Sequence, residues 1–230
     1  MVLACIHNMT NRCFVATYRP LILNRSGRQA AKEHGLPPYI DGSCRREPDL
    51  ESPYPSITAT CRAGNFAPRL QAGDRVAYLT VKSRYGGEPD ASWRLVALLR
   101  VIHRFPSHAE AATWYGERGL LLPSNCLVPQ NPPKAFGLTN GMPPASVRSR
   151  VAAQQDPIRA VRLWNATYRG RVARWPVFLV TEAEFLDLRN PPRVTVADLL
   201  AVFGKIPTTL TPPAVNCGNL ERLLVRVRKE

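Results

Sequence analysis

The chain has 230 residues, of which 45% are hydrophobic and 21% charged, and this ordinary globular composition excludes a wholly disordered protein. Lysine and arginine together number 31 against 17 aspartates and glutamates, so the formal net charge is +14 and a polyanionic partner is favoured. Every apolar run falls short of the roughly 20 residues that a membrane-spanning helix needs, so we expect no membrane partner. An arginine-, proline- and alanine-rich composition also arises in GC-rich genomes, and on that alternative interpretation the charge has no functional meaning.

The N-terminus and the cysteines bear on the compartment. The first nine residues carry no basic segment, so we expect no signal peptide. We therefore expect a cytoplasmic protein, which could also associate with the nucleoid. In a chain of this length without a secretory signal, we expect the six cysteines to be reduced thiols. No Cys-x-x-Cys pair occurs, and Cys5 with His7 is the one close Cys/His pair, so we expect no zinc site and no cofactor.

Four strands are predicted in the first half of the chain, over residues 13–18, 56–61, 75–82 and 93–105. A long polar loop, 19–55, separates the first two, with a short helix expected over 28–34 and ended by Gly35. Loops of this length in compact domains tend to be functional. The third and fourth strands are expected to form a hairpin, and their continuous apolar pattern is typical of a barrel wall covered by helices.

The middle of the chain predicts helices and a closing strand. Ser107 and Glu110 form a capping box for a helix that ends at Gly119, and a short strand is expected over 120–128. Residues 129–144 are rich in proline and glycine. The helical spacing of 147–165 should be broken or kinked at Pro157, and residues 175–181 predict the closing strand.

The C-terminal part predicts further helices. Thr181 with Glu184, and Thr195 with Asp198, have the spacing that caps two short helices, the second ending at Gly204. The tail over 219–229 is basic and amphipathic, which is compatible with a helix or a strand.

The mixed-charge segment from Tyr39 to Tyr54 is the first candidate site. Its charged side chains lie between aromatic residues: Asp41, Arg45, Arg46, Glu47, Asp49 and Glu51. Guanidinium groups bind phosphates and carboxylates accept hydrogen bonds from the amino groups of bases, so a loop with both can bind a nucleotide. The alternative is an arginine–carboxylate network that fixes a long loop.

The order of strands and turns that follows this loop resembles that of a known superfamily. A strand ends in Cys61-Arg62, a Pro-Arg-Leu step includes Arg69, and Gly73-Asp74 leads into a valine-containing strand with a second strand after it, starting at Trp93. This order resembles the PUA-like barrels, which include the PUA, ASCH, EVE and YTH domains. More narrowly, it is similar to the nucleotide-modification-associated domains found near DNA base-modification systems in bacteria and phages.

The resemblance covers roughly residues 13–181 and implies an α+β fold, a PUA-like mixed small β-barrel with peripheral helices. On this view residues 1–181 form the barrel domain, with the long first loop 19–55 and a helical insertion over 107–170. Residues 182–230 form a C-terminal helical extension packed on the same domain. The first loop is longer than in a minimal barrel, and the part after Thr181 has no counterpart.

The resemblance also implies a pocket beside the barrel that recognises a base, often modified and flipped out of the stack. The candidates for stacking on the base are Tyr39, Tyr54, Phe66 and Trp93. The candidates for reading its edge are Asp41, Asp49, Arg62 and Asn125, together with Arg45, Arg46 and Glu47 of the mixed-charge segment. For each aromatic residue alone, packing in the core is the alternative.

An arginine-rich stretch over 148–174 is the second candidate site, with Asp156 as its one carboxylate. Its arginines and the earlier Arg69 are the candidates for binding phosphates: Arg148, Arg150, Arg159, Arg162, Arg169, Arg171 and Arg174. Guanidinium groups interleaved with Trp164 and Tyr168 suit a nucleic-acid backbone with stacked bases. The alternative is a solvated helix face.

Three functions are therefore carried forward. The first is a nucleic-acid-binding module that recognises a modified or flipped base, binds DNA rather than RNA, and works with a base-modifying enzyme. The second is a hydrolase acting on a modified nucleobase, in which Lys82, Thr80 and Glu47 imitate the catalytic set of ASCH relatives. The third is a protein-interaction scaffold whose charge is compositional. No motif of a known nucleophile or zinc deaminase supports catalysis.

Overall fold

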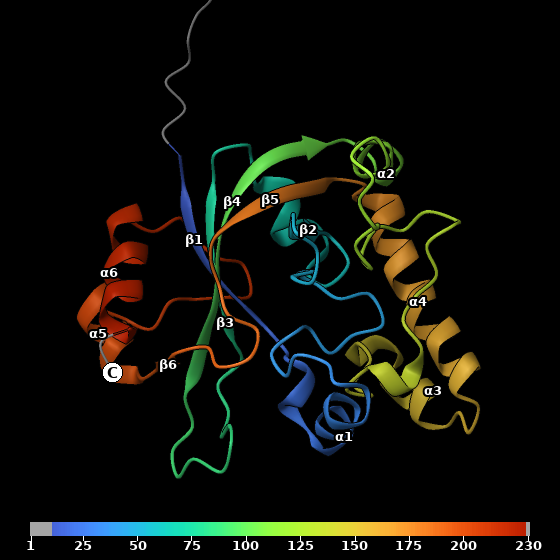
Figure 1. The fold of residues 1–230 in the computed structure, drawn as a ribbon, viewed down its shortest axis with the longest axis horizontal. Helices are drawn as coiled ribbons and strands as arrows, with labels where there is room; N and C mark the ends of the chain where they lie inside the picture. Colours follow the sequence, from blue (N-terminus) through green and yellow to red (C-terminus); the bar gives the residue numbers. More distant parts are fainter. Residues whose placement is uncertain (1–10, 229–230) are drawn as a thin grey trace, which may run out of the picture.

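Residues 11–228 are described by a computed structural model, in which strands from both halves of the chain form one mixed sheet (Figure 1). The strands are β1 (Cys13–Tyr18), β2 (Ser56–Thr58), β3 (Arg75–Thr80), β4 (Trp93–Phe105), β5 (Phe178–Leu186) and β6 (Arg193–Val194). Their order is β1-β3-β4-β5-β2, with β6 paired to β4. The sheet curls into a half-barrel, which with its helices confirms an α+β fold.

Helices lie on both sides of this sheet. The α-helices are α1 (Arg25–His34), α2 (His108–Gly116), α3 (Arg148–Ala152), α4 (Pro157–Arg174), α5 (Val196–Phe203) and α6 (Cys217–Val227). Short 3-10 turns are η1 (Leu21–Leu23), η2 (Ala63–Asn65), η3 (Ala67–Arg69), η4 (Phe136–Leu138) and η5 (Ala145–Val147). Figure 1 shows α5 and α6 on one side of the sheet and α1, α3 and α4 on the other. None of the helices within residues 11–228 is both long and apolar enough to cross a membrane.

The curl of the sheet follows from its pairing. Strand β1 runs parallel to β3, while β3, β4 and β5 pair antiparallel in sequence. The register of the β4–β5 pair shifts twice, and that of the β3–β4 pair shifts once, between Tyr78 and Leu79. Bulges of this kind bend a strand and increase its twist, so they curve the sheet around the side chains on one face.

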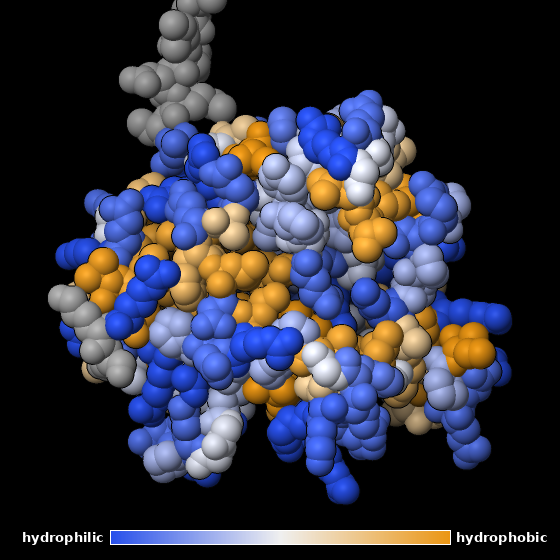
Figure 2. Space-filling view, in the orientation of Figure 1, coloured by the Kyte–Doolittle hydropathy of each residue, from blue (hydrophilic) through white to orange (hydrophobic). Residues whose placement is uncertain are grey.

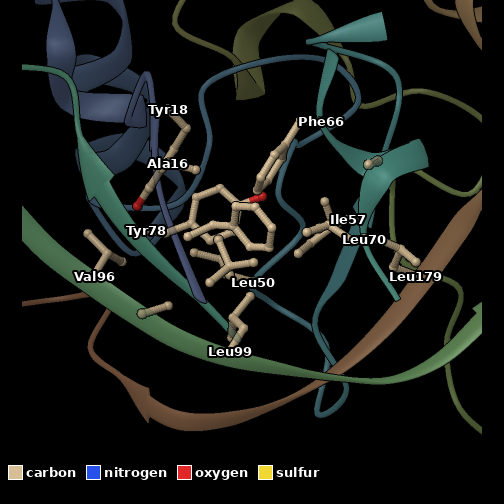
Figure 3. Close-up of a cluster of buried hydrophobic side chains, with 14 of the residues drawn as sticks. Ala16, Tyr18, Leu50, Ile57, Phe66, Leu70, Tyr78, Val96, Leu99 and Leu179 are labelled. Carbon is tan, nitrogen blue, oxygen red and sulfur yellow. The ribbon is translucent and has the colours of Figure 1, made fainter. Parts of the chain in front are cut away.

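Alternation along the strands divides the core into two layers. Phe14, Ala16 and Tyr18 point to the concave face, where Figure 3 shows Tyr18 and Tyr78 near Phe66. The residues between them, Cys13 and Val15, point to the other face, which α5 and α6 cover. The C-terminal helices therefore complete the core from the outside.

Several elements begin or end where local chemistry predicts. Strands β1 and β4 coincide with the predicted ranges, and β3 and β4 form the expected hairpin. Gly35 ends α1 with φ 63°, a left-handed conformation that glycine adopts without strain. Pro157 separates α3 from α4 by starting α4, with Asp156 as the N-cap, because proline needs no hydrogen-bonded amide in the first turn. The tail forms helix α6.

Two predicted elements are wrong. Residues 120–128 form no strand, because side chains satisfy their backbone: Asp49 accepts from the amide of Ser124, and His108 Nδ1 accepts from that of Leu127. The helix expected from Thr181 is absent, because β5 continues to Leu186 in its pairing with β4.

Three strand limits are also corrected. The closing strand, expected over 175–181, is β5 and runs on to Leu186. Strands β2 and β3 end at Thr58 and Thr80, a few residues earlier than predicted.

The expectation of reduced cysteines is wrong for one pair. Cys13 on β1 and Cys217 at the start of α6 form a disulfide across a sequence separation of 204 residues. The outer face of β1 meets the chain just before α6, where Cys13 pairs with Val215, and this brings the two sulfurs together. Cys44, Cys61 and Cys126 are free thiols. Cys5 and His7, and with them the expected absence of a signal peptide, lie outside the described residues.

Candidate functional site

A cavity of about 440 Å³ opens on the concave side of the sheet. Its aromatic walls come from β1, β3, the turn after β2 and helix α4: Tyr18, Tyr78, Phe66 and Tyr168. Tyr18 and Tyr78 meet edge to face, with ring centroids 6.1 Å apart. Tyr78, Phe66 and Tyr168 are each 2% exposed, so these rings are fixed by the surrounding core and give the cavity a preformed shape.

Close backbone approach holds the loop that carries the polar floor. The amide of Gly42 donates to the carbonyl of Arg19, and the amide of Asn140 donates to the carbonyl of Gly42. A Cβ atom at Gly42 would lie 2.1 Å from Asn140 Nδ2, so only glycine allows the two loops to meet here. This contact seats the flanking Asp41 and Ser43 in the cavity wall.

Glu47 contributes a buried carboxyl group to the cavity. Its Oε2 accepts from Thr58 Oγ1 at 2.5 Å, from Thr60 Oγ1 at 3.1 Å and from Asn125 Nδ2 at 3.1 Å. Among the described residues, only the amide of Thr58 donates to its Oε1, at 3.0 Å. No arginine or lysine within residues 11–228 forms an ion pair with it. Burial therefore raises the pKa of Glu47 to about 8, although the hydrogen bonds oppose the shift.

Asp41 is the second buried carboxyl group, 4% exposed. Its Oδ1 accepts from the amide of Ser43 at 2.9 Å and from Ser43 Oγ at 2.5 Å. Burial raises the pKa of Asp41 to about 6, against the lowering effect of the Ser43 hydrogen bonds. The cavity thus places two carboxyl groups with raised pKa values on one surface, and such groups concentrate at functional sites.

Arginines lie around the same cavity. Arg171 of α4 donates to the carbonyls of Thr60 and Cys61, at 2.5 and 3.0 Å, and lies 5.8 Å from the Tyr168 ring centroid. Arg62 donates to the carbonyl of Thr17 and lies 5.4 Å from the Phe66 ring centroid. Neither forms an ion pair with a carboxylate of the described chain, so their positive charge is not neutralised locally.

Four of the residues predicted to bind a base line this cavity: Asp41, Glu47, Arg62 and Phe66. Arg171 of the predicted phosphate-binding set joins them. The mixed-charge loop and the arginine-rich helix therefore meet at one cavity, although they are more than 100 residues apart in the sequence.

The other charged residues of the loop form the alternative network that fixes it. Arg45 is 1% exposed, and it donates to Asn165 Oδ1 and to the carbonyls of Ser124 and Asn131. Arg46 pairs with Glu51. The Arg45 guanidinium holds the loop against α4 and the 124–131 segment, and that of Arg46 also donates to the carbonyls of Asp41 and Leu138. Both groups are engaged within the fold.

The remaining predicted base-binding residues are also engaged within the fold. Asp49 accepts from Ser124, and Asn125 contacts Glu47 and Ser56. Two of the aromatic candidates pack against other rings, with centroids 5.8 Å apart for Tyr39 and Tyr85 and 5.3 Å apart for Tyr54 and Trp114. The third, Trp93, lies under Lys82, whose Nζ is 5.0 Å from the ring centroid.

The three residues of the hydrolase alternative do not assemble. Lys82 is exposed beside Trp93, and Thr80 Oγ1 accepts from the amide of Arg94, while Glu47 lies in the cavity.

The predicted phosphate-binding arginines apart from Arg171 lie at the surface. Those of α3 and α4 are exposed: Arg148, Arg150, Arg159, Arg162, Arg169 and Arg174. Arg69 is exposed and donates to the carbonyl of Asn65. Asp156 does not offset the helix charge by pairing, because its carboxylate caps α4. Figure 2 shows hydrophilic side chains along the α3–α4 side and an apolar band nearer the sheet.

Several cavity residues were absent from the sequence-based candidates, among them Tyr18, Thr58 and Tyr78. Alternation along β1 and β3 carries a signal for the two tyrosines, since it places them on one face of neighbouring strands. The rim formed by Met142, Pro143 and Pro144 comes from the proline-rich excursion and has no such periodicity.

The fold and this cavity define the chain as an α+β protein with a curled half-barrel sheet and a buried acidic, aromatic pocket. Comparison with protein-family models, with curated proteins and with solved structures finds no match. Within residues 11–228, no group of three or more histidine, cysteine, aspartate or glutamate side chains is placed to hold a metal ion.

Proposed function

We propose that this chain is a nucleic-acid-binding module with a PUA-like half-barrel, and that its cavity receives a modified or flipped base. The observation that carries the proposal is the meeting of two buried carboxyl groups and four aromatic rings with unpaired Arg62 and Arg171 at one cavity. Its volume of about 440 Å³ lies within the range of small-molecule sites, roughly 300–1,000 Å³, and accommodates one base with its sugar.

The chemistry of the walls suits an extruded base. A flipped base is held by stacking on aromatic or apolar side chains and by hydrogen bonds to its edge. Tyr18, Phe66 and Tyr78 supply the apolar surface, while the carboxyl groups of Asp41 and Glu47 supply polar contacts to its edge. Arg62 and Arg171 then lie where the sugar and phosphate leave the cavity.

The exposed arginines of α3 and α4 supply the backbone-binding part of the proposal. A protein that neutralises phosphates releases counterions, so its affinity falls linearly with salt on logarithmic axes. We propose DNA as the nucleic acid and a base-modifying enzyme as a functional partner. We also propose a cytoplasmic, nucleoid-associated location. Disulfides are rare in the cytosol, so the Cys13–Cys217 bond weighs against that last part.

Binding of labelled single-stranded DNA, followed by fluorescence anisotropy over a series of salt concentrations, tests the proposal. Each phosphate contact on single strands contributes a slope of about −0.7. Replacing Arg162 and Arg169 with glutamine should therefore flatten the slope by roughly 1 to 1.5. The control removes the same charge elsewhere, with Arg84→Gln and Lys205→Gln, both exposed and outside the α3–α4 face.

Two results would contradict the proposal. One is an affinity that stays constant from low to moderate salt. The other is a control variant that loses as much slope as the α3–α4 variant, which would favour the scaffold alternative with charge of compositional origin. The hydrolase alternative is not proposed, because Lys82 lies outside the cavity that contains Glu47.

A further inference from the structure

Asp41 has an oxygen that no side chain satisfies. Its Oδ1 bonds to Ser43, but its Oδ2 has no hydrogen bond of normal geometry from any donor within residues 11–228. The amide of Glu47 also faces this carboxyl group, without reaching that geometry. Buried polar atoms nearly always have a partner. The Asp41 side chain is almost fully buried and lines the cavity, but Oδ2 is not among the fully enclosed atoms without a partner. This free acceptor is therefore open to the cavity and suits a ligand that donates.

The second carboxyl group, Glu47, has most of its hydrogen-bonding capacity satisfied within the protein. Every contact of Glu47 is a donor that the protein itself provides, from Thr58, Thr60 and Asn125, and these converge mainly on Oε2. Its Oε1 shares one amide and has capacity for another partner. Neither carboxyl group has a cation within ion-pairing distance in the described chain, so no arginine or lysine supplies the missing contact.

The polarity of the cavity fixes how a nucleotide would lie in it. The carboxyl groups of Asp41 and Glu47 occupy the floor, with the free acceptor at Asp41, and the guanidinium groups of Arg62 and Arg171, which form no ion pair within residues 11–228, lie beside them on other elements. A ligand that places hydrogen-bond donors on the floor and an anionic phosphate near the arginines matches both.

Nucleobases differ in the hydrogen-bonding group that they would place against Asp41. Cytosine and adenine carry an exocyclic amino group, whereas uracil and hypoxanthine carry a carbonyl oxygen at the same position. A carbonyl oxygen facing Asp41 would place two acceptors in contact in a cavity from which water is displaced. An amino group would give the free oxygen its donor.

On the basis of the proposed function, we propose that the cavity selects bases with an exocyclic amino group over their carbonyl analogues, and that Asp41 Oδ2 accepts the amino hydrogen. Asp41 is then the residue that determines specificity. The aromatic walls set the shape of the site without distinguishing the two classes.

The test uses seven-residue single-stranded DNA in which one central base is flanked by abasic residues, so that only this base can enter the cavity. The four central bases form two matched pairs, cytosine with uracil and adenine with hypoxanthine. In a titration followed by anisotropy, we expect the amino member of at least one pair to bind about tenfold or more tighter than its carbonyl partner.

The decisive variant is Asp41→Asn. The asparagine oxygen can keep both Ser43 hydrogen bonds while its NH₂ group replaces Oδ2, so the floor becomes a donor and the preference should reverse toward the carbonyl base. The control is Asp90→Asn, which makes the same change at an exposed residue between β3 and β4 and should leave the preference unchanged. Thermal unfolding checks that both variants are folded.

The outcomes separate the two proposals. If the wild-type protein binds the oligonucleotides but the carbonyl members bind as tightly as the amino members, this inference is overturned and the proposed function stands. If the preference exists but Asp41→Asn, folded, keeps it, the assignment to Asp41 is overturned. If no DNA binds at any salt concentration, the proposed function fails and this inference with it.

Discussion

Replacing Glu47 with glutamine should change how the stability of the protein depends on pH. Glutamine keeps one oxygen to accept from Thr58, Thr60 and Asn125, and it imitates the protonated acid. The variant therefore retains the hydrogen bonds made to Oε2, including that from the Thr58 amide, while removing one titration.

The sign and size of the effect follow from the pKa of Glu47, which burial raises from 4.5 to about 8. Between these values the folded protein holds a proton that the unfolded chain has released. The stabilisation is therefore fully present below about pH 4.5 and is lost as the pH rises through about 8. At 1.36 kcal/mol per pKa unit, the loss over this window reaches at most about 5 kcal/mol.

Urea unfolding followed by tryptophan fluorescence, from about pH 5 to about pH 8.5, measures this difference. We expect the unfolding free energy of the wild-type protein to fall over that range relative to Glu47→Gln, by about 3 to 5 kcal/mol. Titration of Asp41 affects both proteins equally and cancels in the comparison. Glu33→Gln, a matched change on the exposed face of α1, should run parallel to the wild type. Parallel curves for wild type and Glu47→Gln would refute the reasoning, because they would mean that Glu47 stays ionised in the fold.

Three further changes test the fold around the site. Arg45→Ala leaves Asn165 and two carbonyls without a donor and opens a buried space. Urea unfolding should therefore show a loss of about 3 to 5 kcal/mol in the free energy of unfolding. A loss below about 1 kcal/mol would mean that this network does not fix the loop. Cys217→Ser should cost about 2 to 5 kcal/mol under oxidising conditions and nothing after reduction of both proteins, and alkylation of the native protein should leave Cys13 unmodified. Thr195→Ala removes the capping box of α5 and should cost about 1 kcal/mol, whereas Thr208→Ala in the exposed segment beyond this helix should cost little.

Local sequence patterns predicted an element correctly where the element depends on its own residues. The limits of β1 and β4 follow from their β-prone side chains and flanking turns, and α5 follows from its capping box and Gly204. The strand expected over 120–128 fails for the opposite reason. Its backbone groups are satisfied by Asp49 and His108, which lie well before it in the chain, and no local pattern contains them.

In the candidate site, the arginines also divide into those that the sequence placed correctly and those that it did not. Arg45 and Arg46 lie in the loop that was predicted to bind, yet both are buried in the network that fixes it, whereas Arg62 and Arg171 line the cavity. Which arginine is free depends on where Asn165 and Ser124 lie in the fold, and that is a property of tertiary packing. The spacing of Tyr168 and Arg171 on one side of α4 is the part that a helical pattern could supply.

The bond between Cys13 and Cys217 has a mechanical consequence. It closes a ring that contains the whole sheet and every helix up to the start of α6, with the bonded residues 204 positions apart. If the oxidised protein were stretched between handles at residues 11 and 228, tension would pass through the disulfide and bypass the sheet. Only the dozen or so residues outside the ring would extend, by roughly 20 Å as α6 unwinds, against roughly 700 Å more once the bond is reduced. A single thiol–disulfide exchange would thus decide whether a pulling force is felt by the half-barrel at all.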